Sequence, residues 1–143
     1  MSRLQIVLGV KGAFAIFVLA LPMLFLPLEA FQFLDIPEFS APALFFIRLC
    51  GAMILSVATF QLWVCVDLSH RKGGVVGTLV ECVTTLGFLW HYFFYGYMAT
   101  WPVFGKLLVM GFALAQFAFL VAIVVTGWEA IFSRGGGEAV AAP

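Results

Sequence analysis

The sequence predicts an all-α integral membrane protein, with four transmembrane helices in an up-down bundle. Its composition is the first reason, because 64% of the 143 residues are hydrophobic and 10% are charged. Soluble domains are roughly half apolar and about a quarter charged. The second reason is a set of apolar runs long enough to cross a hydrocarbon core, which takes about 20 helical residues. These runs cover about 4–28, 43–66, 75–97 and 103–128, within a single transmembrane domain at 1–130.

The first run, 4–28, has a basic start, so a cleaved signal peptide is its alternative interpretation. Its length, and the lack of an A-x-A site before the next polar stretch, favour a retained helix. A proline has no amide hydrogen, and its ring collides with the preceding helical turn. We therefore expect Pro22 and Pro27 to kink or end this helix.

The connection after the first run, LEAFQFLDIPEFSAP, is too short and too polar to span a membrane. Its apolar residues alternate with Gln32, Asp35 and Glu38, which predicts a short amphipathic piece lying in the membrane interface.

The connection after the third run places aromatic side chains at the outer boundary, where such side chains act as anchors. They are Tyr95, Tyr97 and Trp101. The tail at 131–143 is rich in glycine, and we expect it to be flexible.

Basic residues are distributed unequally between the two ends of the predicted bundle. Lys106 lies at one end, and the other end has Arg3, Lys11, Arg71, Lys72 and Arg134. The positive-inside rule then places both termini in the cytoplasm. We expect a multi-pass protein of a bacterial inner membrane, with an organelle membrane as the alternative.

Two ionisable residues, Arg48 and Glu81, lie within the apolar runs. Such residues cost a few kcal/mol at the bilayer centre and are read first as functional or bundle-facing. Each lies roughly 9 Å inside its helix, but the two helices run in opposite directions, so their depths differ by roughly 12 Å. We therefore disfavour a direct ion pair, and expect Arg48 to extend outward to the acidic first connection, which carries Glu29, Asp35 and Glu38.

For Glu81, two alternatives stay open: a functional role, or a contact with an inner basic residue. Those residues are Lys11, Arg71 and Lys72.

Helical spacing groups Glu81 with other polar residues. Gly77, Thr84 and Thr85 recur with it at three- and four-residue intervals, so they share one face, which we expect to look inward. The fourth run contributes one amide, Gln116. Plain helix packing also selects small and hydroxylated residues, so packing is the alternative role of the threonines.

The two histidines do not form a shared site. His70 and His91 would be roughly 30 Å apart along a straight helix, too far to hold one haem. His91 stands between Trp90 and Tyr92 and is expected to be an interfacial polar tip. The cysteines lack the spacing of a zinc or redox motif, so no metal or other cofactor is expected. They are Cys50, Cys65 and Cys82.

The elements LDIP, FFIRLCGAMIL and DLSHRK follow one another in the first half of the chain. This order resembles small bacterial four-helix membrane proteins, whose second helix often opens with an R-L-x-G-like element and ends at a charged turn. The matching residues are Arg48, Leu49, Gly51, Asp67, Arg71 and Lys72. Such families have no established activity, so the resemblance implies a fold and no catalytic residue.

Taken together, these patterns favour a non-enzymatic accessory, scaffold or assembly component of a membrane complex, or a homo-oligomer, with the lipid bilayer as its surroundings. Seven basic and seven acidic residues cancel, so no nucleic-acid partner is expected. The first alternative is a small transporter or channel in which Glu81 binds a proton or cation and Arg48 guards the outer mouth. The second is a lipid- or quinone-modifying enzyme with Arg48 and His91 near the outer headgroups.

Overall fold

A computed structural model describes residues 2–32, 41–96 and 98–132, and every regular element in these ranges is helical. Four helices of the described chain are long and apolar enough to cross a membrane. They are Arg3–Phe25, Ala43–Val66, Arg71–Phe94 and Val103–Trp128. The prediction of an all-α, multi-pass, four-helix membrane protein is therefore confirmed. Residues 33–40 of the predicted interfacial connection, Tyr97 and the tail from 133 onward lie outside the described residues.

The first span is built from three consecutive helical segments, α1, η1 and α2. They run Arg3–Phe14, Ala15–Ala20 and Leu21–Phe25, and the short helix α3 (Leu28–Gln32) follows them. A capping box starts α1: the Ser2 hydroxyl accepts a hydrogen bond from the Gln5 amide at 3.2 Å, and the Gln5 side chain accepts one from the Ser2 amide at 2.7 Å. These bonds satisfy amide groups that a helix start leaves open.

Both prolines of the first span shape it. The segment η1 is a π-helix that ends two residues before Pro22, and the Leu21 amide donates to the carbonyl of Ile16, five residues back. A wider turn relieves the contact between a proline ring and the preceding carbonyl. The span ends at Phe25 because Leu26, the residue before Pro27, is extended, with φ −66° and ψ 138°. It therefore ends three residues earlier than the apolar run suggested.

The other three spans are single helices. They are α4 (Ala41–Val66), α5 (Arg71–Phe94) and α6 (Val103–Phe132), with a 3₁₀ turn, η2 (Leu68–His70), between α4 and α5. The expected start of the third span at 75 was wrong, because Gly73 and Gly74 are helical rather than part of a loop. The earlier start places every residue of α5 about 6 Å deeper, at a rise of ~1.5 Å per residue.

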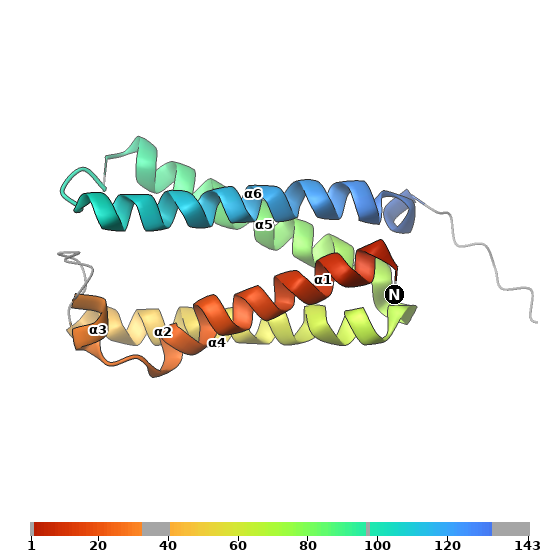
Figure 1. Cartoon of the computed structure of the whole chain (residues 1–143), viewed down its shortest axis with the longest axis horizontal. Helices are drawn as coiled ribbons and strands as arrows, with labels where there is room; N and C mark the ends of the chain where they lie inside the picture. Colours follow the sequence, from red (N-terminus) through yellow and green to blue (C-terminus); the bar gives the residue numbers. More distant parts are fainter. Residues whose placement is uncertain (1, 33–40, 97, 133–143) are drawn as a thin grey trace, which may run out of the picture.

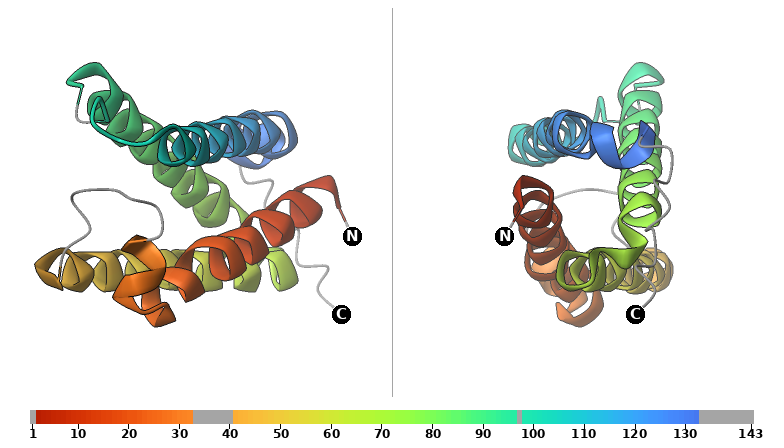
Figure 2. Two further views of the ribbon diagram at one scale, coloured as in Figure 1. Left: turned by 60° about the vertical axis from the view of Figure 1, so that its left-hand side comes forward. Right: turned by 90° about the vertical axis from the view of Figure 1, so that its right-hand side faces the viewer.

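The helices form two hairpins (Figure 1). The first span lies along α4, and α6 lies along α5, while α1 also contacts α6. The start of α1, the turn between α4 and α5, and the end of α6 lie together at one end of the bundle, which we call the inner end. From there α5 runs away from α4, so that the two helices separate toward the outer end (Figure 2).

A buried apolar cluster occupies the inner end. Its members come from all four spans and are Leu4, Leu8, Val64, Cys65, Val75 and Ile123. Small residues let the helix backbones approach one another there, as is usual in membrane bundles. A Cβ atom on Gly74 would lie 2.5 Å from Cγ1 of Val64, and one on Gly127 would lie 2.8 Å from Cγ1 of Val75. This close packing holds the inner ends of the spans in fixed positions and so sets the depth of their polar residues.

Candidate functional site

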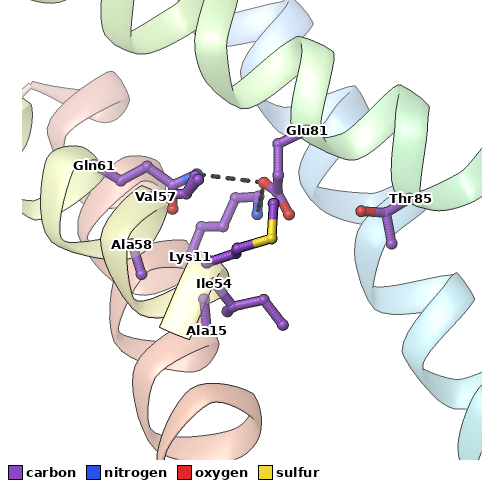
Figure 3. A pocket seen from close by; sticks show the side chains of 9 residues that line it. Lys11, Ala15, Ile54, Val57, Ala58, Gln61, Glu81 and Thr85 are labelled. Carbon is purple, nitrogen blue, oxygen red and sulfur yellow. Dashed lines mark hydrogen bonds and ion pairs between the residues drawn. The ribbon is translucent and has the colours of Figure 1, made fainter. Parts of the chain in front are cut away.

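An ion pair in the middle of the bundle joins the first span to the third (Figure 3). Nζ of Lys11 donates to Oε2 of Glu81. The Lys11 side chain is 1% exposed and the Glu81 side chain 26% exposed, so the cation is enclosed and the carboxylate is partly open. Lys11 lies about 12 Å from the start of α1 and Glu81 about 15 Å from the start of α5. Both charges are therefore deep inside their spans.

The pair corrects the place that the sequence suggested for Lys11. We counted Lys11 among basic residues at the inner boundary, but it is buried in the bundle and belongs to no boundary. Arg3, Arg71 and Lys72 still stand at the starts of α1 and α5, and Lys106 at the start of α6. The unequal distribution of basic residues therefore persists, and the orientation in the membrane stays a prediction.

A third polar side chain, Gln61 of α4, completes the group. Its Nε2 donates to Oε2 of Glu81 at 3.3 Å, and the residue is 1% exposed. Its Oε1 is buried and accepts no hydrogen bond within the described part of the chain. We call these three residues the Lys11–Gln61–Glu81 cluster. Sequence reasoning missed Gln61, although an amide inside the apolar run 43–66 was a visible signal of a costly buried group.

Two cavities meet at this cluster. One, of about 180 Å³, is bounded by α1, α4 and α5, and Lys11, Gln61 and Glu81 all line it. Thr85 lines it as well and comes from the same helix as Glu81 (Figure 3). The other, of about 510 Å³, lies between α4 and α5 and includes Gln61 and Glu81 in its wall. Its remaining wall residues are Ser56, Val57, Phe60, Gly77, Thr78, Val80 and Thr84.

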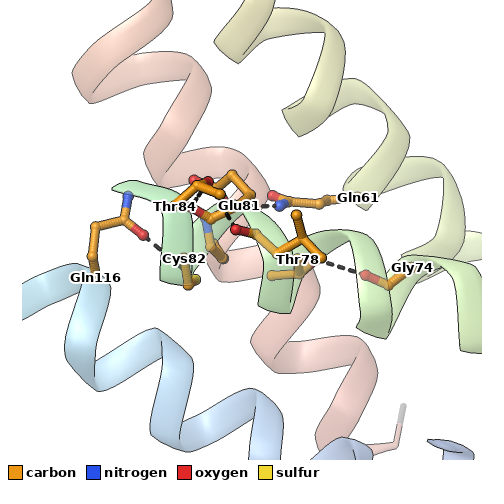
Figure 4. Close-up of polar contacts among 9 residues, drawn as sticks. Gln61, Gly74, Thr78, Glu81, Cys82, Thr84 and Gln116 are labelled. Atoms are coloured by element: carbon orange, nitrogen blue, oxygen red, sulfur yellow. Dashed lines mark hydrogen bonds and ion pairs between the residues drawn. The ribbon is translucent and has the colours of Figure 1, made fainter. Parts of the chain in front are cut away.

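The other predicted polar residues near Glu81 bond elsewhere (Figure 4). The Thr84 hydroxyl is 2.8 Å from the Val80 carbonyl and 3.1 Å from the Glu81 carbonyl, so it is satisfied by its own helix. Gln116 of α6 is buried, and its Oε1 accepts a bond from Sγ of Cys82 at 3.5 Å. Gln116 therefore links α6 to α5 through Cys82, and in the described part of the chain it makes no hydrogen bond to Glu81.

Arg48 and Glu81 have different partners. Nη1 of Arg48 donates to the backbone carbonyl of Leu24, in the last turn of α2. A cation at a helix C-terminus is favourable because the last carbonyls have no partner within the helix. The expected contact of Arg48 with Glu29 is not formed in the described part of the chain, and Asp35 and Glu38 lie outside the described ranges.

His91 lies close to the outer end of α5. Its ring centroid is 4.3 Å from that of Tyr95, and both side chains are exposed. The interfacial polar tip expected for His91 stays a prediction. In the ranges that the structure describes, no three His, Cys, Asp or Glu side chains gather in a group that could hold a metal ion.

Fold and site together define a class: a multi-pass four-helix membrane protein with a Lys–Gln–Glu cluster inside the bundle. No protein-family model, no curated protein and no solved structure matches the chain. The resemblance to small bacterial four-helix membrane proteins therefore stays an expectation, and the function has to be argued from the cluster itself.

Proposed function

We propose that the protein is a small transporter or channel in which Glu81 takes up and releases a proton. The observation that carries this proposal is an ion pair whose cation is enclosed and whose carboxylate is 26% exposed beside two cavities. A buried ion pair adds little net stability, because removing both charges from water costs about as much as their attraction returns. Paired charges within a membrane more often mark the path of an ion or substrate.

The groups around Glu81 make its contacts depend on whether its carboxylate carries a proton. Lys11 faces it from α1, the amide of Gln61 faces it from α4, and the thiol of its neighbour Cys82 is bonded to Gln116 of α6. A proton added to the carboxylate changes the charge of the pair from zero to +1 and removes its attraction for Lys11. The link between the first span and α5 then weakens. Two conformations that differ in this link respond to protons through their different affinities for them.

The accessory or assembly role is the second candidate. It is favoured by the fact that Lys11 and Glu81 neutralise one another within the chain, so the pair can serve helix packing without taking up an ion. On this alternative the pair only fixes how the two hairpins meet. The carboxylate then stays ionised while the fold persists.

The two candidates differ in whether Glu81 accepts a proton in the folded protein. A lipophilic carbodiimide reacts with protonated carboxyl groups in apolar surroundings, so labelling of Glu81 is expected to increase as the pH is lowered. Peptide mass spectrometry of the reconstituted protein locates the label, and Glu81→Gln is the control for the site. Constant, low labelling of folded protein at all pH values would contradict the transport proposal. Co-purification of a partner in mild detergent would then favour the accessory role.

A further inference from the structure

The larger cavity has the shape of a groove on the face of the bundle. Most of its wall residues, among them Phe60, Gly77 and Val80, are exposed rather than enclosed by other helices. A groove on this face of a membrane-spanning bundle opens to lipid. Its volume of about 510 Å³ lies within the range of roughly 300–1,000 Å³ typical of small-molecule sites.

Along most of the groove, the wall does not require a ligand to have polar groups. The hydroxyls of Ser56 and Thr84 donate to the carbonyls of Ala52 and Val80 of their own helices, at 3.0 and 2.8 Å. Val57, Phe60, Gly77 and Val80 contribute apolar surface. An occupant of the groove is therefore apolar along most of its length.

The groove has one polar place, where Gln61 and Glu81 form part of the wall. Glu81 is an acceptor that is partly open, and Oε1 of Gln61 is an acceptor that is buried without a donor. An unsatisfied buried oxygen is destabilising, because it has lost its hydrogen bonds to water. A ligand that donates hydrogen bonds here, with a small rotation of the amide, removes that cost. The head group that suits this place is a hydrogen-bond donor.

The charge of that head group follows from the ion pair. Lys11 and Glu81 sum to zero. A cationic or anionic head would leave one uncompensated charge in apolar surroundings, which is strongly unfavourable. A neutral hydroxyl donates its hydrogen bond to one of these acceptors without changing the net charge.

We infer that the groove between α4 and α5 binds a neutral membrane lipid whose head group is a hydroxyl, with the head at Gln61 and Glu81 and the acyl chain along the groove. The inference rests on the proposed function, because it names the class of cargo that the proposed transporter would carry. It adds a binding site that is testable by itself.

Gly77 offers a way to fill the groove without disturbing the bundle. A Cβ atom on Gly77 meets no other atom within 4 Å, and the same is true of Gly87, ten residues further along α5 and absent from the wall of the groove. Gly77→Phe is therefore expected to fold and to occupy the space of the acyl chain. Gly87→Phe is the matched control, since it adds the same ring to the same helix elsewhere.

The experiment is photolabelling of the full chain in proteoliposomes by three probes with identical photoreactive acyl chains. The probes are a diacylglycerol, a phosphatidic acid and a dialkylammonium, with neutral, anionic and cationic heads. We expect the diacylglycerol to label peptides of α4 and α5. The Gly77→Phe substitution is expected to lower this labelling about tenfold, which corresponds to a loss of about 1.4 kcal/mol of binding free energy. Gly87→Phe is expected to label like the wild type.

Equal labelling of the wild type by the charged probes and by the diacylglycerol would overturn the inference. It would also be overturned if the diacylglycerol labelled Gly77→Phe as strongly as the wild type. Labelling of the groove by diacylglycerol without pH-dependent carbodiimide labelling of Glu81 would overturn the proposed proton switch and leave the lipid site standing. The opposite result would remove the lipid site and leave the proton switch. The two proposals therefore fail separately.

Discussion

On α5 and α6, two glycines near the inner end of the bundle allow close helix contacts, whereas two glycines in the outer halves of the same helices face open space. Gly74 and Gly127 leave room for Val64 and Val75, which would meet any added Cβ atom at 2.5 and 2.8 Å. Gly87 and Gly111 would meet nothing within 4 Å. At these four positions the same residue type allows close packing near the inner end and leaves open space toward the outer end.

The outer half also contains apolar cavities. One of about 360 Å³ lies between the first span, α4 and α5, and Met23, Phe46 and Tyr92 are among its wall residues. Another of about 630 Å³ lies between α5 and α6, beside Trp90 and Phe117. The Lys11–Gln61–Glu81 cluster stands between the packed half and the open half. Its location means that changes in the ion pair act where the hairpins cease to be held together by packing.

The largest expected effect comes from breaking the ion pair on one side. Lys11→Ala leaves the Glu81 carboxylate without its cation, and we expect the free energy of unfolding to fall by about 3–5 kcal/mol. The double variant Lys11→Met/Glu81→Met removes both charges and should recover most of this loss. Thermal unfolding in detergent measures both, and Lys106→Ala, at the outer end, is a control for losing a lysine. A double variant as unstable as Lys11→Ala alone would show that charge compensation is not the cause.

The second prediction tests the packing difference by comparing a leucine-to-alanine substitution in the inner cluster with the same substitution on the exposed surface of α6. Leu8 is fully buried in the inner cluster, and Leu108 on α6 is 49% exposed. Leu8→Ala is expected to cost about 2–3 kcal/mol because it opens a cavity, and Leu108→Ala less than about 0.5 kcal/mol. Similar melting temperatures for the two variants would contradict a packed inner half.

A third pair of variants sharpens the role of glycine at the inner turn. Gly74→Ala pushes a methyl group against the stiff side chain of Val64 and should cost about 1–3 kcal/mol. Gly73→Ala, one residue earlier, meets nothing within 4 Å and should stabilise the helix by about 0.5–1 kcal/mol. Denaturation in mixed micelles compares them, and opposite signs are expected. A stabilising Gly74→Ala would mean that α4 and α5 approach less closely than described.

The smallest effect concerns the turn that joins α4 to α5. The backbone amide of Ser69 donates to the Asp67 carboxylate at 2.9 Å, and this bond, the Ser69 side chain and the nearby His70 lower the pKa of Asp67 below 3.8. A lowered pKa in the folded state stabilises the fold above pH 3.8, and this contribution is lost as the pH falls through the folded-state pKa. Asp67→Asn should therefore melt slightly below the wild type at neutral pH. The difference should vanish in strong acid, and a difference that persists there would contradict this origin.

The elements of the fold could be predicted because their signals are local. Four apolar runs of sufficient length predict four spans, and Pro22 and Pro27 mark where the first one changes its turn and ends. The start of α5 was missed because two adjacent glycines usually indicate a loop. Here Gly74 is helical, and its lack of a side chain lets α5 approach Val64.

The candidate site was only half visible in the sequence. Glu81 stood out because a carboxylate in an apolar run is costly, and Lys11 was one of three basic residues considered for it. The depth of Glu81 was underestimated because α5 starts at Arg71 rather than at 75. Lys11 was placed at the boundary because it was grouped with the basic residues of the inner end. Gln61 was missed because a single amide shows no partner until the helices are placed.

The sequence by itself determined that this chain is a membrane bundle, since length and apolarity decide whether a segment can cross a hydrocarbon core. Only the tertiary structure decided which charges meet. Lys11 and Glu81 are 70 residues apart in the chain, and their contact depends on how deep each helix lies and which face it turns inward. Those quantities are set by the packing of Gly74, Val64 and their neighbours at the inner end, and no local pattern contains them.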